Sequence, residues 1–233
     1  SKASPALLDI VIDDCTASYG GGGAIIDASP TLDGLVVTNT TAESDGGGLY
    51  IDGGAPWVVR SRFEGCYASG ASAVYATNSA VQVENTIFFN NQSALGAALH
   101  LPDGQTVTVL NIVAALNVTG NDKEACAVEL GSGATLYNSA AYGNEGSGLC
   151  SDGTAAYNIS YGNQEEDFII GGNAEPGEGD LTDDPQFVDP NLGDFSIRSA
   201  SPMIDAGNPD SAYNDTDGTR ADMGVYGGPE GSW

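Results

Sequence analysis

The sequence predicts an all-β protein: a right-handed, single-stranded parallel β-helix of about seven coils with a C-terminal cap. Three observations lead to this prediction. A triplet of small residues followed by a short apolar segment recurs about every 25 residues, columns of Asn recur between these segments, and the 233 residues include 33 Gly. Periods of this length are typical of repeat architectures. Because Gly costs about 1 kcal/mol per helical position relative to Ala, stacked strands are favoured over helices.

The repeat is clearest at the first apolar position after each triplet. These positions follow one another at spacings of 25, 25, 25, 29 and 21 residues, and they are Ala24, Leu49, Val74, Leu99, Val128 and Leu149. The last two spacings together equal two periods, so an insertion is offset by a deletion. Each segment is short, rich in β-forming residues and bounded by turn residues, which indicates a strand. Equivalent positions of successive coils are then expected about 4.8 Å apart.

Two columns of small polar residues follow the other short apolar runs. One column contains Asn85, Asn111, Asn138 and Asn158, and the other contains Asp14, Asn39, Gly65, Asn91, Asn117, Asn144 and Asn163. Stacked Asn side chains hydrogen-bond along a column in cross-stacked sheets, and Asn tolerates the left-handed backbone of a tight bend. We therefore expect both columns at the bends of the coils.

Charge divides the chain into two regions. Residues 1–164 carry the repeats and are expected to form the coils, whereas residues 165–233 hold 16 of the 32 acidic residues and are expected to form an acidic coil and cap region continuous with the solenoid. The chain has only 6 Lys and Arg and a net charge of −26. Nucleic acid is excluded as a partner because binding a polyanion needs basic residues to displace its counterions. No apolar stretch is long enough to insert into a membrane.

Two kinds of segment resemble a known group of proteins. Phe88-Phe89-Asn90-Asn91 and the Gly triplets resemble segments of bacterial right-handed parallel β-helix proteins of the pectin-lyase-like superfamily, including polymorphic outer-membrane and autotransporter-type passengers. The segment DPQFVDPNLGDFSIRSASPMIDAGNPD, with DTDGTRADMGVYGG after it, is similar to a closing module of secreted bacterial β-helix proteins. The resemblance implies a secreted or cell-surface bacterial protein. It implies no reaction, because the superfamily includes lyases, hydrolases, epimerases, adhesins and passive stalks.

A candidate ligand-binding surface follows from the alternation of strand side chains. If Ala24 and its equivalents point inward, the next residue of each coil points outward, and this column is Ile25, Tyr50, Tyr75, His100, Glu129 and Cys150. Asp27 and Asp52 lie two positions further along and edge the same strip. Aromatic faces pack on sugars, and carboxylates and His hydrogen-bond to hydroxyls. The alternative is that the aromatic column only stabilises the sheet.

His100 and Glu129 are candidates for a catalytic general acid/base pair, because they are expected one coil apart in the same column. The alternative is that a solitary His is ordinary surface decoration. Arg60 and Arg62 also stand out among few basic residues: they are expected either to meet an acidic sugar or to neutralise neighbours such as Glu84.

Calcium is the metal that the C-terminal region favours, since hard cations prefer clustered oxygen ligands. The candidate ligands are Asp205, Asp210, Asp215, Asp217 and Asp222. Two alternatives stand beside calcium: the aspartates make turn and salt-bridge contacts, or the acidity provides solubility in salty surroundings.

The four cysteines are expected to be free thiols. Cys15 and Cys66 fall in one column two coils apart, which places them about 9.6 Å apart at about 4.8 Å per coil, whereas a disulfide needs Cα atoms within about 7 Å. Cys126 and Cys150 are assigned to different columns and are therefore also expected to be unpaired.

The function expected from these features is a secreted or cell-surface scaffold that binds extracellular carbohydrate or a cell-surface partner without turnover. One alternative is a small polysaccharide lyase, hydrolase or epimerase that acts on acidic polysaccharide. Another is a passive stalk of a larger adhesin. The sequence starts at Ser1 with neither an initiator Met nor a signal peptide, which indicates a processed or cloned start. Because its N-terminal part shows no obvious cap, we expect it to be part of a larger secreted chain.

Overall fold

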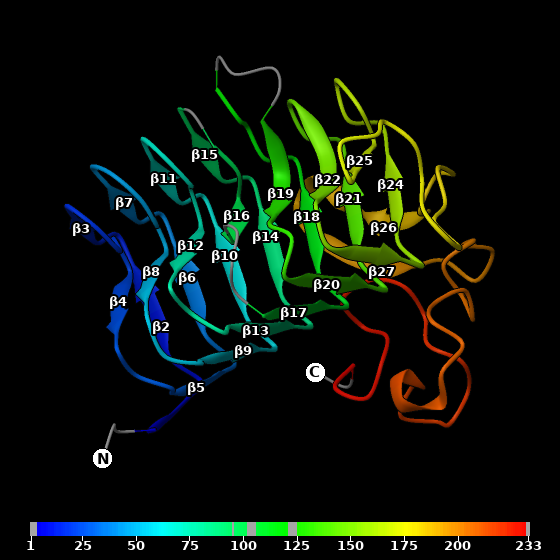
Figure 1. Ribbon diagram of the computed structural model, residues 1–233, viewed down its shortest axis with the longest axis horizontal. Helices are drawn as coiled ribbons and strands as arrows, with labels where there is room; N and C mark the ends of the chain where they lie inside the picture. Colours follow the sequence, from blue (N-terminus) through cyan, green and yellow to red (C-terminus); the bar gives the residue numbers. More distant parts are fainter. Residues whose placement is uncertain (1–3, 95, 102–105, 121–124, 232–233) are drawn as a thin grey trace.

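The structure is a computed structural model that describes residues 4–94, 96–101, 106–120 and 125–231. The chain winds into a parallel β-solenoid, and the strands of successive coils stack along the length of a rod (Figure 1). The predicted parallel β-helix is therefore confirmed. The solenoid has about five turns, slightly fewer than the predicted seven coils.

In the part of the chain that the structure describes, three sheets of seven parallel strands run along the rod. The first sheet consists of β1 (Ala6–Leu8), β5 (Thr31–Asp33), β9 (Trp57–Val59), β13 (Gln82–Glu84), β17 (Val107–Leu110), β20 (Ala134–Tyr137) and β23 (Thr154–Ala156). The second consists of β2 (Val11–Asp13), β6 (Val36–Thr38), β10 (Arg62–Glu64), β14 (Ile87–Phe89), β18 (Val113–Ala115), β21 (Ala140–Tyr142) and β24 (Ile159–Tyr161).

The third seven-stranded sheet carries the candidate surface. It consists of β4 (Gly23–Ile26), β8 (Leu49–Asp52), β12 (Val74–Thr77), β16 (Leu99–Leu101), β19 (Cys126–Leu130), β22 (Ser147–Ser151) and β25 (Phe168–Ile170), and we call it the site sheet. A smaller sheet lies between the second sheet and the site sheet along the chain, and it consists of β3 (Thr16–Ala17), β7 (Thr41–Ala42), β11 (Tyr67–Ala68) and β15 (Gln92–Ser93).

Pairing within the site sheet tests the predicted repeat. The column of first apolar positions is confirmed for Leu49, Val74, Leu99, Val128 and Leu149. The prediction is wrong by one residue in the first coil, where Gly23 pairs with Leu49 and Ala24 pairs with Tyr50. Four consecutive Gly, Gly20 to Gly23, lead into this strand and the last of them begins it, so the triplet could be placed in two ways, and this coil is one residue longer than the next.

The interior of the rod is filled by like residues stacked on one another. Phe63 and Phe88 belong to adjacent strands of the second sheet, are fully buried, and stack with ring centroids 5.5 Å apart. Leu99 and Leu149 fill the equivalent position under the site sheet. Each buried side chain of this size contributes about 1.5–3 kcal/mol relative to exposure. The stacked core therefore holds the sheets, and with them the site, in a fixed register.

A buried ladder of Asn side chains also runs along the rod. The Nδ2 of Asn91 donates to Oδ1 of Asn117 at 3.0 Å, and Asn117 donates in the same way to Asn144 at 2.9 Å. Asn144 continues the ladder to Asn163 at 2.8 Å, and the carboxylate of Asp167 accepts from Asn163 at 2.7 Å. The predicted hydrogen bonding along this column is confirmed.

The position of this ladder differs from the prediction, which put its members at left-handed bends. The left-handed residues are one place earlier: Asn90 and Leu116 both have φ 53° and continue the column of Asp14 and Asn39. The ladder instead continues the column of Thr40 and Cys66, since Cys66 donates its N–H to Oδ1 of Asn91. In the other column the left-handed residue of the last coil is Tyr157, and Asn158 pairs with Ser139.

The C-terminal region begins inside the last coil, because β25 still pairs with β22. It continues as an antiparallel hairpin of β26 (Phe187–Asp189) and β27 (Asp194–Ile197), which the short 3-10 helix η1 (Pro190–Leu192) joins, and as η2 (Ser211–Tyr213). Figure 1 shows the chain after β27 returning along the outside of the rod toward its middle. Among the described residues, no helix is long and apolar enough to cross a membrane.

We call residues 203–230 the C-terminal strap. The Nδ2 of Asn85 donates to the carbonyls of Val225 and Gly227, and the Nδ2 of Asn111 donates to those of Asp222 and Gly224. Two further contacts hold it to the coils: the N–H of Gly224 donates to the carbonyl of Asn138, and Arg60 pairs with Glu230. A side-chain column that the sequence predicted for bends thus also holds the strap to the coils.

Candidate functional site

The outer face of the site sheet carries the predicted column. Register confirms that Tyr50 pairs with Tyr75, Tyr75 with His100, and His100 with Glu129. The ring centroids of Tyr50 and Tyr75 are 5.7 Å apart with planes inclined by 12°, and those of Tyr75 and His100 are 5.3 Å apart with planes inclined by 2°. Tyr19, which the sequence analysis did not select, adds a tilted ring 5.1 Å from Tyr50. We call these four ring residues the aromatic rail.

Stacking decides which part of each ring a ligand can reach. Neighbouring rings of Tyr50, Tyr75 and His100 cover one another's faces, and all three side chains are half-buried. Tyr50, Tyr75 and His100 therefore present ring edges to solvent, and the packing of sugars on aromatic faces stays a prediction. Burial raises the pKa of both tyrosines, and the charges of Asp45 and Asp52 raise it further. Both hydroxyls remain protonated donors at neutral pH.

The predicted alignment of Asp27 with Asp52 is wrong. Asp52 pairs with Ile26 in the first coil, and Ile25, which was expected to point outward, packs against the core. Asp27 instead sits at the corner that follows, with a left-handed backbone at φ 50°, and donates its N–H to the carbonyl of Asp52. The cause is the same one-residue shift that displaces Ala24. Of the two aspartates that were predicted to edge the strip, only Asp52 lies on a strand of the rail.

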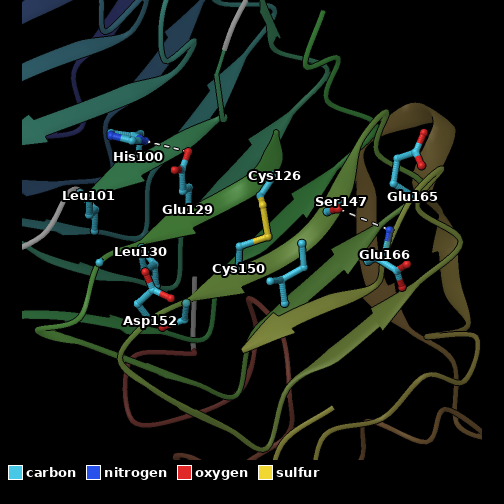
Figure 2. Close-up of a pocket in the computed structure, with 13 residues that line it drawn as sticks. His100, Leu101, Cys126, Glu129, Leu130, Ser147, Cys150, Asp152, Glu165 and Glu166 are labelled. Atoms are coloured by element: carbon cyan, nitrogen blue, oxygen red, sulfur yellow. Dashed lines mark hydrogen bonds and ion pairs between the residues drawn. A yellow bond between two sulfur atoms is a disulfide. The ribbon is translucent and has the colours of Figure 1, made fainter. Parts of the chain in front are cut away.

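At His100 the rail runs into a groove of about 620 Å³. Strands β16, β19, β22 and β25 form its floor, and Figure 2 shows the side chains that project into it. We call it the acidic groove, because its charged lining is His100, Glu129, Asp152, Glu165 and Glu166. The sequence analysis included the first two as a candidate pair; the last two lie in the turn before β25, outside the repeat that guided the selection.

In the described lining of the groove, His100 and Glu129 are the two titratable side chains that hydrogen-bond to each other. The Nδ1 of His100 lies 3.0 Å from Oε2 of Glu129. This hydrogen bond, aided by the positive charge of a protonated imidazole, lowers the pKa of Glu129 although burial opposes the shift. The predicted proximity of the two side chains is confirmed, whereas their catalytic role stays a prediction.

A disulfide lies in the middle of the groove lining, and it corrects the expectation of four free thiols. Cys126 and Cys150 are bonded, with Cα atoms 6.0 Å apart. The prediction failed because it required one column, whereas β19 and β22 are adjacent strands and residues of different columns there can still approach within disulfide range. Cys15 and Cys66 are free, as the spacing predicts.

Three further carboxylates stand in the groove without a partner among the described residues. Figure 2 shows Asp152 on one side of the disulfide and Glu165 and Glu166 on the other. All three residues are exposed, and none of their carboxylates makes a hydrogen bond or ion pair with the part of the chain that is described. Their separation distinguishes them from a metal cluster, since no group of three potential metal ligands converges among the described residues.

The basic residues lie elsewhere. The four described Arg all contact the C-terminal region or residues that adjoin it: Arg60 pairs with Asp33 and Glu230, Arg62 with Glu64 and the carbonyl of Gly193, Arg198 with the carbonyl of Val188, and Arg220 with the carbonyl of Gly207. Of the two roles weighed for Arg60 and Arg62, neutralising neighbouring acids is the one that their contacts show. The site sheet is left with a strongly negative face.

The five candidate calcium ligands lie in the strap, and the carboxylates of four of them accept hydrogen bonds from its backbone. Asp215 accepts hydrogen bonds from the N–H groups of Asp222 and Gly228, and Asp222 accepts one from the N–H of Asp205. Burial raises the pKa of both acceptor carboxyls. Asp217 accepts from Thr219, and Asp210 caps η2. These contacts agree with the turn role weighed beside calcium, and calcium binding stays a prediction.

The fold and the groove together define a class: a parallel β-solenoid protein with an aromatic rail that leads into an acidic groove. Comparison with known proteins places it no more closely, since neither a family model nor a curated protein matches the chain.

Proposed function

We propose that this protein is a secreted or cell-surface binding protein that holds an extracellular oligosaccharide on the outer face of the site sheet without altering it. The observation that carries the proposal is that an open groove of about 620 Å³ continues a straight column of ring side chains. An elongated site of this kind suits a polymer better than a compact metabolite.

The chemistry of the face supports a polyhydroxylated ligand. The hydroxyls of Tyr50 and Tyr75 donate hydrogen bonds, and the carboxylates of Glu129 and Asp152 accept them from sugar hydroxyls. The Cys126–Cys150 disulfide supports a place outside the reducing cytoplasm, because disulfides persist in oxidising compartments. Membership of the pectin-lyase-like superfamily is part of the proposal, and the parallel solenoid supports it.

Titration calorimetry with defined oligosaccharides tests the proposal. We expect one class of oligosaccharide to bind, and Tyr75→Ala to weaken that binding at least tenfold. Tyr67→Ala is the matched control, because Tyr67 is an exposed tyrosine on β11, in a different sheet. Absence of binding to every oligosaccharide, or equal weakening by both variants, would contradict the proposal. Absence of both binding and turnover would favour a passive stalk.

The His100–Glu129 hydrogen bond favours a second candidate function, that of a small polysaccharide lyase, hydrolase or epimerase. In this case His100 transfers a proton while the carboxylate of Glu129 orients its ring. Incubation with polysaccharides distinguishes the two functions: unsaturated products, new reducing ends or epimerised sugars that disappear in His100→Gln would establish turnover. Binding without any product would leave the non-catalytic function.

A further inference from the structure

We infer that the acidic groove selects oligosaccharides of amino sugars with protonated amines over neutral sugars and uronates. This inference deepens the proposed function and rests on it. Its basis is the placement of the unpartnered carboxylates within the groove, together with the absence of any described Arg from the groove lining.

The carboxylates are distributed along the groove. Asp152 and the pair Glu165 and Glu166 lie on opposite sides of the disulfide (Figure 2), and Glu129 stands beside His100 where the rail enters. A single metal ion needs its ligands gathered around one point, and the described residues offer no such gathering. Anionic groups set apart along an elongated groove instead match a polymer whose cationic groups recur from one sugar to the next.

The charge balance of the groove also excludes the opposite class of ligand. His100 is the one basic side chain in its lining, and it is already hydrogen-bonded to Glu129. The described arginines do not line the groove and contact other carboxylates, carbonyls and rings instead. A uronate polymer would therefore meet negative charge without compensation, while the same field attracts a polycation and raises its local concentration.

The hydroxyls of the rail favour a ligand that carries hydroxyl groups as well as positive charge. Tyr50 and Tyr75 present hydroxyl-bearing edges next to the groove, and Asp52 lies two positions along the strand from Tyr50. A basic peptide would satisfy the carboxylates yet leave these polar edges to water. An amino sugar offers its amine to the carboxylates and its hydroxyls to the rail, so it uses both parts of the face.

Calorimetry at moderate ionic strength tests the inference with four probes: a β-1,4-linked glucosamine hexamer, its fully N-acetylated counterpart, a galacturonate hexamer and hexalysine. We expect the glucosamine hexamer to bind at least tenfold more tightly than the N-acetylated hexamer, and the galacturonate hexamer not to bind. The preference is expected to shrink when the pH is raised until the amines lose their protons, and when salt is added.

Variants locate the effect. We expect the double variant Glu165→Gln/Glu166→Gln to bind the glucosamine hexamer with a preference over the N-acetylated hexamer that is at least threefold smaller. We expect the same of the single variant Asp152→Asn. Asp183→Asn is the matched control, because Asp183 is an exposed carboxylate outside the groove lining. All these side chains are exposed, so the variants are expected to fold, and circular dichroism checks that they do.

The outcomes separate this inference from the proposed function. Binding of the N-acetylated hexamer as tight as that of the amine form, still lost in Tyr75→Ala, would overturn the charge selection and keep the oligosaccharide function. Hexalysine binding as tight as that of the glucosamine hexamer, or equal losses in the groove and control variants, would show general attraction to an acidic protein and overturn the inference. Binding of no sugar would overturn both.

Discussion

At the scale of single residues, the buried Asn ladder shows how one side chain can serve two coils. Asn91 is fully buried; its Oδ1 accepts from the N–H of Cys66, and its Nδ2 donates both to the carbonyl of Phe63 and to Asn117. An amide is the side chain that supplies a donor and an acceptor on one planar group. The ladder thus satisfies backbone groups at a corner that the sheets leave open.

We expect Asn91→Ala to lower the free energy of unfolding by roughly 3 kcal/mol, because each buried polar group that loses its partner costs about 1–3 kcal/mol. Urea unfolding followed by circular dichroism measures the change. Asn90→Gly is the matched control: Asn90 is exposed, and its left-handed backbone at φ 53° suits Gly. Equal losses in the two variants would mean that the ladder has no special contribution.

At the scale of elements, the disulfide links two adjacent strands of the site sheet across the groove lining. Cys126 starts β19 and Cys150 lies near the end of β22, so the bond fixes one strand against the next beside Glu129. The repeat departs from its 25-residue period here, because Leu99 and Val128 are 29 residues apart. The disulfide holds β19 against β22 at this irregular coil.

The double variant Cys126→Ser/Cys150→Ser is expected to be less stable than the wild type by about 3 kcal/mol, the usual effect of closing a loop of this length. Thermal unfolding with and without a reductant measures it. The reductant should lower the midpoint of the wild type and leave that of the double variant unchanged. Cys15→Ser, at an exposed free thiol, should match the wild type; a destabilisation as large as that of the double variant would contradict this assignment.

Strand columns were predictable where the period is regular and not where the local sequence allows two alignments. Tyr50, Tyr75, His100 and Glu129 were placed correctly because each is anchored by an apolar neighbour that fits only the interior. A run of four Gly offers no such anchor, which is why Ala24 was displaced by one residue.

Two alignments were also possible for the Asn columns. Contacts between individual residues of different coils were harder to predict than the columns. Asn90 and Asn91 are chemically identical, yet one takes the left-handed bend and the other the buried ladder. The disulfide, and the approach of Glu165 and Glu166 to the groove, depend on how coils outside the regular period are placed. A one-dimensional repeat does not contain that information.

At the scale of the whole molecule, the strap gives the rod two unlike sides. It binds the corner column of Asn85 and Asn111 and pairs its Glu230 with Arg60, whereas no described Arg lines the acidic groove of the site sheet. A chain with a net charge of −26 needs such local neutralisation wherever acidic segments are packed together.

Asn111→Gly tests the hold of the strap. Asn111 has φ 51°, so Gly fits its backbone. The substitution removes the two hydrogen bonds to the carbonyls of Asp222 and Gly224, and a long contact with Asn138. We expect amide exchange in residues 222–228 to become about 10-fold faster while exchange in β14 and β18 is unchanged. Asn78→Gly, at an exposed left-handed corner, is the control; identical exchange in the two variants would remove this role.

The direction of the strap has a consequence for how the rod comes apart. Its polar contacts run back from Asn138 to Arg60, so they brace the coils in between, whereas Leu8, Val11 and Ile26 of the first coil remain exposed apolar side chains. The coils are therefore not expected to unfold all at the same free energy along the rod. We expect the coils between Arg60 and Asn138 to open later than the first described coil, and the acidic groove, whose strands β16 and β19 lie among these braced coils, to keep its shape longer.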